Sequence, residues 1–169
     1  MKVLGVDPGS RVIGYAILDT GDELLGFGEH SFHKKEYLDR FITLEATLDW
    51  IFQVYPNIDE VAVEQAVRFR DRKIAELEVA VRIIKKWAQR QKKRIGLYYP
   101  ATWKAGVTGK SKATKDNVAR IVCLHFPQVR EESDHVTDAI AIGMYHRARR
   151  KTDLMVEATA QGKVWEGEI

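Results

Sequence analysis

The order in which short β-rich runs and longer helical stretches follow one another is the feature that most restricts the fold of this chain. Three β-rich runs come first, at residues 3–6, 12–18 and 24–32, and turn-forming residues separate them. This arrangement predicts a three-stranded antiparallel meander. Between residues 36 and 55 the apolar residues recur at helical spacing instead, and Pro56 follows as a stop signal.

Strands and helices alternate through the rest of the chain. The patterns predict strands at 61–63 and 95–99 and helices at 73–91, 115–126 and 134–150. Together with the meander, this order indicates an α/β domain in which helices flank a central mixed five-stranded sheet. We expect this domain to span residues 1–151. Periodicity is lost afterwards, so residues 152–169 are expected to form a loose or partner-docked tail.

Composition narrows the class of protein further. With 169 residues, 45% hydrophobic and 30% charged, the chain fits one ordered domain with a full core. It contains no run of about 18 apolar residues that could span a bilayer and no pattern typical of a signal peptide. A single cysteine, Cys123, cannot form an internal disulfide or a cysteine-based zinc site. We therefore expect a cytoplasmic protein without a membrane partner.

The net charge of +3 conceals a strong asymmetry. Residues 1–67 carry 5 Lys/Arg against 12 Asp/Glu, whereas residues 68–120 carry 16 against 4. A basic segment of this size is typical of proteins that bind a polyanion such as DNA or RNA. A solvated, lysine-rich helix face would produce the same composition, and charge alone does not separate these two interpretations.

Acidic residues stand where regular elements begin or end. Asp7 closes the first predicted strand, and Glu64 closes the fourth. Adjacent strand ends of an open α/β sheet meet at one crevice, so both carboxylates can point into one site. His135 and Asp138 are three residues apart and share one face of the last helix, with Asp134 beside them.

A cluster of carboxylates requires a cation, because like charges repel one another. Oxygen ligands suit Mg²⁺ or Mn²⁺, and two such ions about 4 Å apart can hold the attacking and leaving oxygens of a phosphodiester. Each residue also has a simpler interpretation. Asp7 is also a turn former before Pro-Gly-Ser, and Glu64 fits a solvated rim position. Either Asp134 or Ser133 fits an N-cap, and His135 fits an ordinary surface histidine.

Four motifs, in order over residues 3–145, resemble the RuvC-type Holliday junction resolvases. The first is residues 5–16, GVDPGSRVIGYA, in which the family's Asp is a metal ligand, and the second is residues 63–65, VEQ. The third combines PATWK at 100–104 and VTGK at 107–110 with Ala113 and Lys115, and the last is DHVTDAIA at 134–141. The resemblance implies a ribonuclease H-like fold and metal-dependent cleavage of branched DNA.

The resemblance also assigns expected roles to residues. It implies that Asp7, Glu64, His135 and Asp138 are catalytic and bind two Mg²⁺ ions per active site, with Mn²⁺ also accepted. Many family members have Asp where this chain has His135, and imidazole favours Mn²⁺ or the transfer of a proton. Asp134 is expected to be a further, supporting ligand or a capping residue.

The DNA-binding residues implied by the resemblance lie in two basic stretches. In the loop after Glu64, Phe69 is the candidate to stack on an exposed base, although a place in the core or a dimer interface fits it equally well. The residues GKSKATK at 109–115 resemble a nucleotide-binding loop only superficially, so no nucleotide cofactor is expected. The expected DNA contacts are Arg68, Phe69, Arg70, Lys110, Lys112 and Lys115.

These expectations combine into one hypothesis, a homodimeric endonuclease that makes symmetric nicks in four-way or other branched DNA. Two symmetric cuts need two sites related by a two-fold axis. The helix at 73–91 is the expected pairing surface, through Val79, Ala80 and Ile83. The alternatives are a YqgF-type nuclease acting on RNA, a non-catalytic junction-binding protein, and one half of an actin-like or sugar-kinase ATPase. The last needs two such domains, for which this chain is too short.

Overall fold

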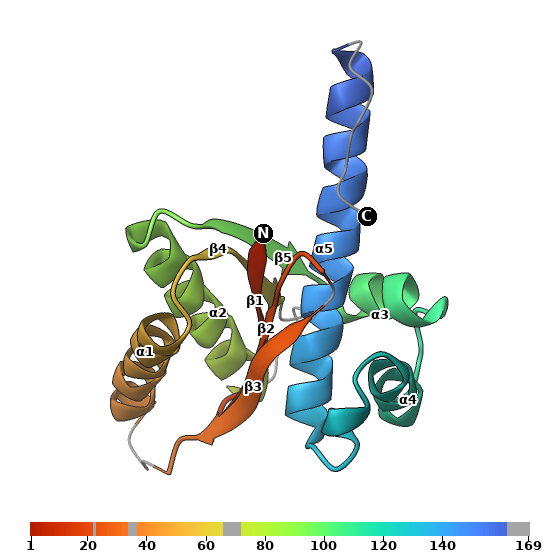
Figure 1. Cartoon of the computed structure of the whole chain (residues 1–169). Helices are drawn as coiled ribbons and strands as arrows, with labels where there is room; N and C mark the ends of the chain where they lie inside the picture. The colour runs from red at the N-terminus through yellow and green to blue at the C-terminus, as the bar shows by residue number, and fades with distance from the viewer. Residues whose placement is uncertain (22, 34–36, 66–71, 162–169) are drawn as a thin grey trace.

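A mixed five-stranded sheet in the order β3-β2-β1-β4-β5 forms the centre of the molecule (Figure 1). The computed structural model describes all residues except 22, 34–36, 66–71 and 162–169. The first three strands pair antiparallel, and β4 and β5 continue the sheet in parallel with β1. The strands are β1 (Lys2–Pro8), β2 (Val12–Leu18), β3 (Leu24–Ser31), β4 (Ile58–Glu64) and β5 (Arg94–Tyr98).

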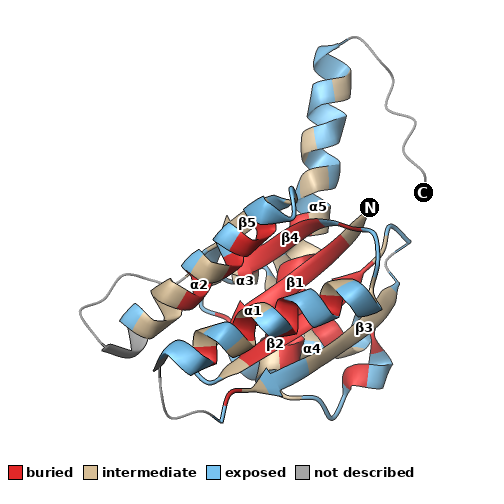
Figure 2. Cartoon of the chain, turned by 90° about the vertical axis from the view of Figure 1, so that its left-hand side faces the viewer, coloured by how far each residue is buried: buried red, intermediate tan, exposed pale blue. Residues whose placement is uncertain are grey.

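Helices cover both faces of this sheet, and each face has its own apolar core (Figure 1). On one face Trp87 packs among the buried residues, and on the other Trp103 does so. The three inner strands, β2, β1 and β4, are mostly buried between the two layers, whereas the edge strands β3 and β5 are only partly buried (Figure 2). The first layer consists of α1 (Tyr37–Val54) and α2 (Arg72–Arg90), and the second of α3 (Pro100–Thr108), α4 (Lys115–His125), the short 3₁₀ turn η1 (Pro127–Val129) and α5 (Asp134–Ala160).

Two glycines allow the backbone of α5 to touch the sheet. A Cβ atom at Gly5 of β1 would lie 2.2 Å from the carbonyl oxygen of Ala139. At Gly14 of β2 it would lie 2.1 Å from the carbonyl oxygen of His135. Both separations are far below van der Waals contact, so any larger residue would push α5 away from the strands.

The structure confirms the predicted meander, the α/β class and the mixed five-stranded sheet. One helix was not predicted, and another is longer than predicted. The segment after β5 forms α3, a helix of nine residues that begins at Pro100 and is closed by Gly109 in the left-handed conformation (φ 76°). The last helix continues to Ala160 instead of ending near residue 150, so much of the predicted tail is helical. Residues 162–169 lie outside the described residues.

The close approach of α5 to Gly5 leads to a first prediction. Gly5→Ala should lower the free energy of unfolding by about 1–3 kcal/mol, because the added methyl group must displace a backbone carbonyl. Urea unfolding followed by circular dichroism measures this change. Gly21→Ala is the matched control, since a Cβ there meets nothing within 4 Å, and its effect should stay within about 0.5 kcal/mol. Equal stabilities of the two variants would contradict the close approach of α5 to β1.

Candidate active site

The ends of two parallel neighbouring strands bring two carboxylates together. Val6 of β1 pairs with Val63 of β4, so Asp7 and Glu64, the next residue of each strand, stand side by side at one edge of the sheet. Asp7 is only 8% exposed, and Glu64 is partly buried. The prediction that strand order would bring these two residues to one place is therefore confirmed.

The first turns of α5 add a histidine and a third carboxylate. Ser133 caps the helix by accepting a hydrogen bond from the backbone N–H of Val136, so the residue before Asp134 is the cap. Nδ1 of His135 lies 2.7 Å from Oδ2 of Asp7. Asp138, one turn further, is 9% exposed, and its buried Oδ1 has no hydrogen-bond partner among the described residues.

Burial and mutual repulsion make these carboxyl groups hard to ionise. Burial raises the pKa of Glu64 to about 7, and the charge of Asp7 adds to the effect. Burial and Asp7 likewise raise the pKa of Asp138 to about 6. The pKa of His135 is also raised, chiefly by its hydrogen bond to Asp7. The site therefore holds more negative charge than its surroundings stabilise.

Two residues of α3 belong to the site although the sequence analysis did not assign them there. The indole Nε1 of Trp103 donates a hydrogen bond of 2.8 Å to Oε2 of Glu64. The ammonium group of Lys104 lowers the pKa of both Glu64 and Asp138 by its charge. Both residues occur in the motif PATWK, but only the unpredicted helix turns them toward the carboxylates.

Asp134 is paired with a lysine. Nζ of Lys115 donates to Oδ2 of Asp134 over 2.8 Å, and each side chain is more than half exposed. This hydrogen bond raises the pKa of Lys115. Glu29 of β3 accepts a hydrogen bond from Ser133 and so adds one more acidic group beside the start of α5. Glu29 was not predicted, since a lone Glu in a strand carries no pattern that indicates a functional site.

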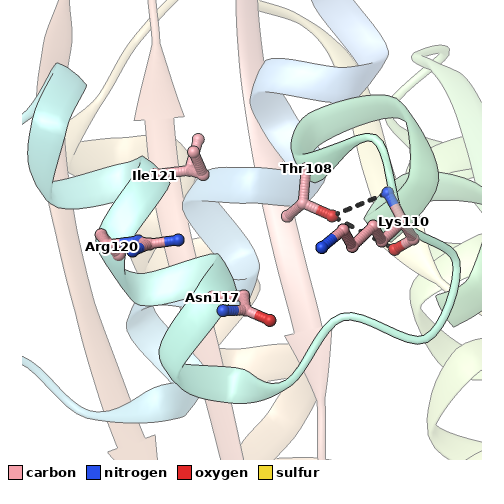
Figure 3. A pocket seen from close by; sticks show the side chains of 5 residues that line it. All are labelled: Thr108, Lys110, Asn117, Arg120 and Ile121. Carbon is pink, nitrogen blue, oxygen red and sulfur yellow. Dashed lines mark hydrogen bonds between the residues drawn. The ribbon is translucent and has the colours of Figure 1, made fainter.

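Two other predicted DNA-binding residues, Lys110 and Lys112, lie in the α3–α4 layer. Lys110 lines a small pocket of about 70 Å³, together with Thr108, Asn117, Ile121 and Arg120, a basic residue that was not predicted (Figure 3). Lys112 is exposed in the turn before α4. Arg68, Phe69 and Arg70 lie outside the described residues.

The carboxylates and the imidazole of this site are suitable ligands for a divalent cation, although their side chains are not gathered closely enough to surround one. Among the described residues, no three His, Cys, Asp or Glu side chains lie close enough together to hold a metal ion. The charges of Asp7, Glu64 and Asp138 nevertheless act on one another, and among the described residues the Oδ1 atom of Asp138 lacks a hydrogen-bond partner. A buried carboxylate oxygen without a hydrogen bond is costly unless a cation satisfies it.

A mixed sheet in this order, with helices on both faces, is a ribonuclease H-like fold, and it carries carboxylates on two parallel central strands and on a helix across one face. The family model for crossover junction endodeoxyribonuclease RuvC matches residues 3–146. The chain belongs to the RuvC family.

Individual relatives agree with this assignment. The crossover junction endodeoxyribonuclease RuvC of Aliarcobacter butzleri is 30% identical over 88% of this chain and 99% of that protein. The Sulfurovum enzyme is 33% identical over 89% and 98%. The fold is that of Thermus thermophilus RuvC, solved in complex with a Holliday junction substrate. It has a TM-score of 0.80 at 22% identity over 90% of this chain and 96% of that one. No helix in the described part of the chain could cross a membrane.

The raised pKa of Glu64 leads to a second prediction, for the metal-free protein. An unfolded Glu ionises near pH 4.5, whereas folded Glu64 keeps its proton until about pH 7. The folded state therefore binds more protons between these values, and the carboxyl group's contribution to stability is lost as the pH rises through them. Glu64→Gln stays uncharged. Its stability advantage over the wild type should grow by roughly 3 kcal/mol between pH 4.5 and 7.5.

Denaturant unfolding in EDTA across this pH range measures the difference. Glu131→Gln, at an exposed position in the turn before α5, serves as the control. A constant difference between Glu64→Gln and the wild type at every pH would contradict the raised pKa.

Proposed function

We propose that this chain resolves Holliday junctions, and cuts other branched DNA, by metal-dependent phosphodiester hydrolysis that leaves symmetric nicks. The observation that carries this proposal is the meeting of Asp7, Glu64 and Asp138, with His135 hydrogen-bonded to Asp7, in a RuvC-family fold. Like-charged buried carboxylates of this kind are typical of a site built for a cation.

Activity in the RuvC family depends on divalent cations. In the proposed site, Asp7, Glu64, Asp138 and His135 hold two Mg²⁺ ions, and Mn²⁺ also fits because one ligand is an imidazole. When bound, such ions supply a nucleophilic water and neutralise charge on the phosphate. Asp134 takes a supporting role, since its carboxylate is held by Lys115.

Basic residues around the carboxylates complete the proposed mechanism. Lys104 places positive charge near Glu64 and Asp138, and Lys115 does so beside Asp134. Both lysines are placed to stabilise negative charge that develops on a bound phosphate. If Nδ1 of His135 donates to Asp7, its Nε2 remains available to bind a cation or to transfer a proton.

We further propose that the protein acts as a homodimer, because symmetric nicks require two sites related by a two-fold axis. The predicted pairing surface on α2 needs one correction. Ala80 is 2% exposed and packs in the core, so it is not available to a partner, whereas Val79 and Ile83 remain partly exposed. A cytoplasmic location and a partner-docking role for the segment after residue 151 stay predictions.

The proposed function is tested with a labelled synthetic four-way junction incubated with Mg²⁺, with Mn²⁺ or with EDTA. Paired, symmetric nicks are expected only with metal. Glu64→Gln should lower the single-turnover rate at least a hundredfold, because an amide is a poor substitute for a carboxylate ligand. An RNA substrate of the same shape is the comparison. Junction binding without cutting in any metal, or faster cutting of RNA, would contradict the proposal.

A fourth prediction concerns the basic surface of the α3–α4 layer. The double variant Lys110→Gln/Lys112→Gln should weaken junction binding. It should also reduce the slope of log affinity against log salt by about 0.9 for each phosphate that the variant no longer neutralises. The matched control, Lys86→Gln/Lys92→Gln, removes two exposed lysines at the end of α2 and the turn that leads into β5, away from the carboxylates. Equal salt slopes for the two variants would show that Lys110 and Lys112 do not contact the phosphates of the junction.

A further inference from the structure

The carboxylate of Glu64 is held by a buried indole. Trp103 is fully buried in the core between the sheet and α5, and its Nε1 donates to Oε2 of Glu64 over 2.8 Å. Within the described part of the chain, no second hydrogen bond reaches this carboxylate. One oxygen of Glu64 is thus fixed by the protein, while Oε1 is left without a partner there.

The chain brings Trp103 to Glu64 by a short route. Glu64 and Tyr98 are paired in register at the ends of β4 and β5. Only Tyr99 separates β5 from Pro100, which starts α3 with its preset backbone angle. The backbone N–H of Trp103 donates to the carbonyl of Tyr99 over 3.2 Å. This first turn of α3 directs the indole back over the end of β4.

We propose that Trp103 is a positioning residue for the cleavage reaction. Its indole N–H orients the Glu64 carboxylate so that Oε1 is presented to a divalent cation beside Asp7 and Asp138. This inference rests on the function proposed above and adds to it a residue that does not touch the substrate. Nζ of Lys104 lies 5.3 Å from the centre of the Trp103 ring, so the positive charge of this lysine is held against the same indole.

A second indole–carboxylate pair in the chain shows what a structural role alone looks like. Nε1 of Trp87 donates to Oδ1 of Asp49, also over 2.8 Å, in the layer formed by α1 and α2. Trp87 is 1% exposed and so is buried as deeply as Trp103, but its partner Asp49 is an exposed residue. A buried indole N–H needs a partner, and Trp87 finds one outside any site. Trp103 instead bonds to the carboxylate that faces Asp7 and Asp138.

The pair of variants Trp103→Phe and Trp87→Phe tests the inference in the full-length protein. Each keeps an aromatic ring and removes one indole hydrogen bond to a carboxylate. Binding of Mn²⁺ to the metal-free protein is measured by electron paramagnetic resonance, and single-turnover cutting is measured on a four-way junction. Trp103→Phe should bind Mn²⁺ about tenfold more weakly and cut at least tenfold more slowly, since hydrogen bonds to charged groups are the stronger ones.

The control readouts separate positioning from stability. Junction affinity in EDTA should be unchanged in both variants, and Trp87→Phe should bind Mn²⁺ and cut as the wild type does. Equal Mn²⁺ affinities and cutting rates for the two variants, alongside an active wild type, would overturn the role of Trp103 and leave the proposed function intact. A wild type that never cuts contradicts the proposed function instead.

A second measurement keeps Trp103 in place and does not depend on the folding of Trp103→Phe. In ¹H–¹⁵N spectra, Glu64→Gln should shift the indole N–H resonance of Trp103, because the acceptor changes from a carboxylate to an amide. The resonance of Trp87 should not move. A Trp103 resonance that is the same in both proteins would overturn the inference.

Discussion

Direct backbone contact between α5 and the sheet is the constraint on which the rest of the site depends. Gly5 and Gly14 leave no side chain between the strands and the helix, so the carbonyl groups of Ala139 and His135 reach the sheet surface. At this distance His135 can bond to Asp7, and the buried Asp138 faces the ends of β1 and β4. A helix held one side chain further away would carry the same residues without bringing them together.

Two of the buried acidic residues, Glu60 beside α5 and Asp138 on it, differ in whether the protein compensates their charge. Glu60, near the start of β4, accepts hydrogen bonds from Arg150 and is paired with His146 at 2.7 Å. Its charge is thus compensated by the protein, which is what a structural carboxylate requires. Asp138 has an oxygen that bonds to none of the described residues and a pKa raised to about 6. This difference separates the carboxylate that holds the helix from the one that we propose binds a cation.

Strand order and the main acidic residues could be predicted because their signals are local. Asp7 and Glu64 end β-rich runs, and His135 and Asp138 share a helical face. The helix α3 could not be predicted, since its nine residues carry little amphipathic pattern and begin with a proline that also fits a turn. Trp103 and Lys104 were missed with it. The pairing of Lys115 with Asp134 depends on two helices packing together, which no spacing in the sequence reveals.

The length of α5 has a consequence for how this chain can vary. Arg147 and Arg150 bond α5 to the body of the protein, and the outer end of the helix projects away from it (Figure 1). The family match ends at residue 146. A residue inserted beyond Arg150 would turn the outer part of the helix by about 100° and lengthen it by about 1.5 Å. The first turns of α5, which carry His135 and Asp138, would stay where they are. Selection is thus free to redirect the projecting segment without altering the chemistry.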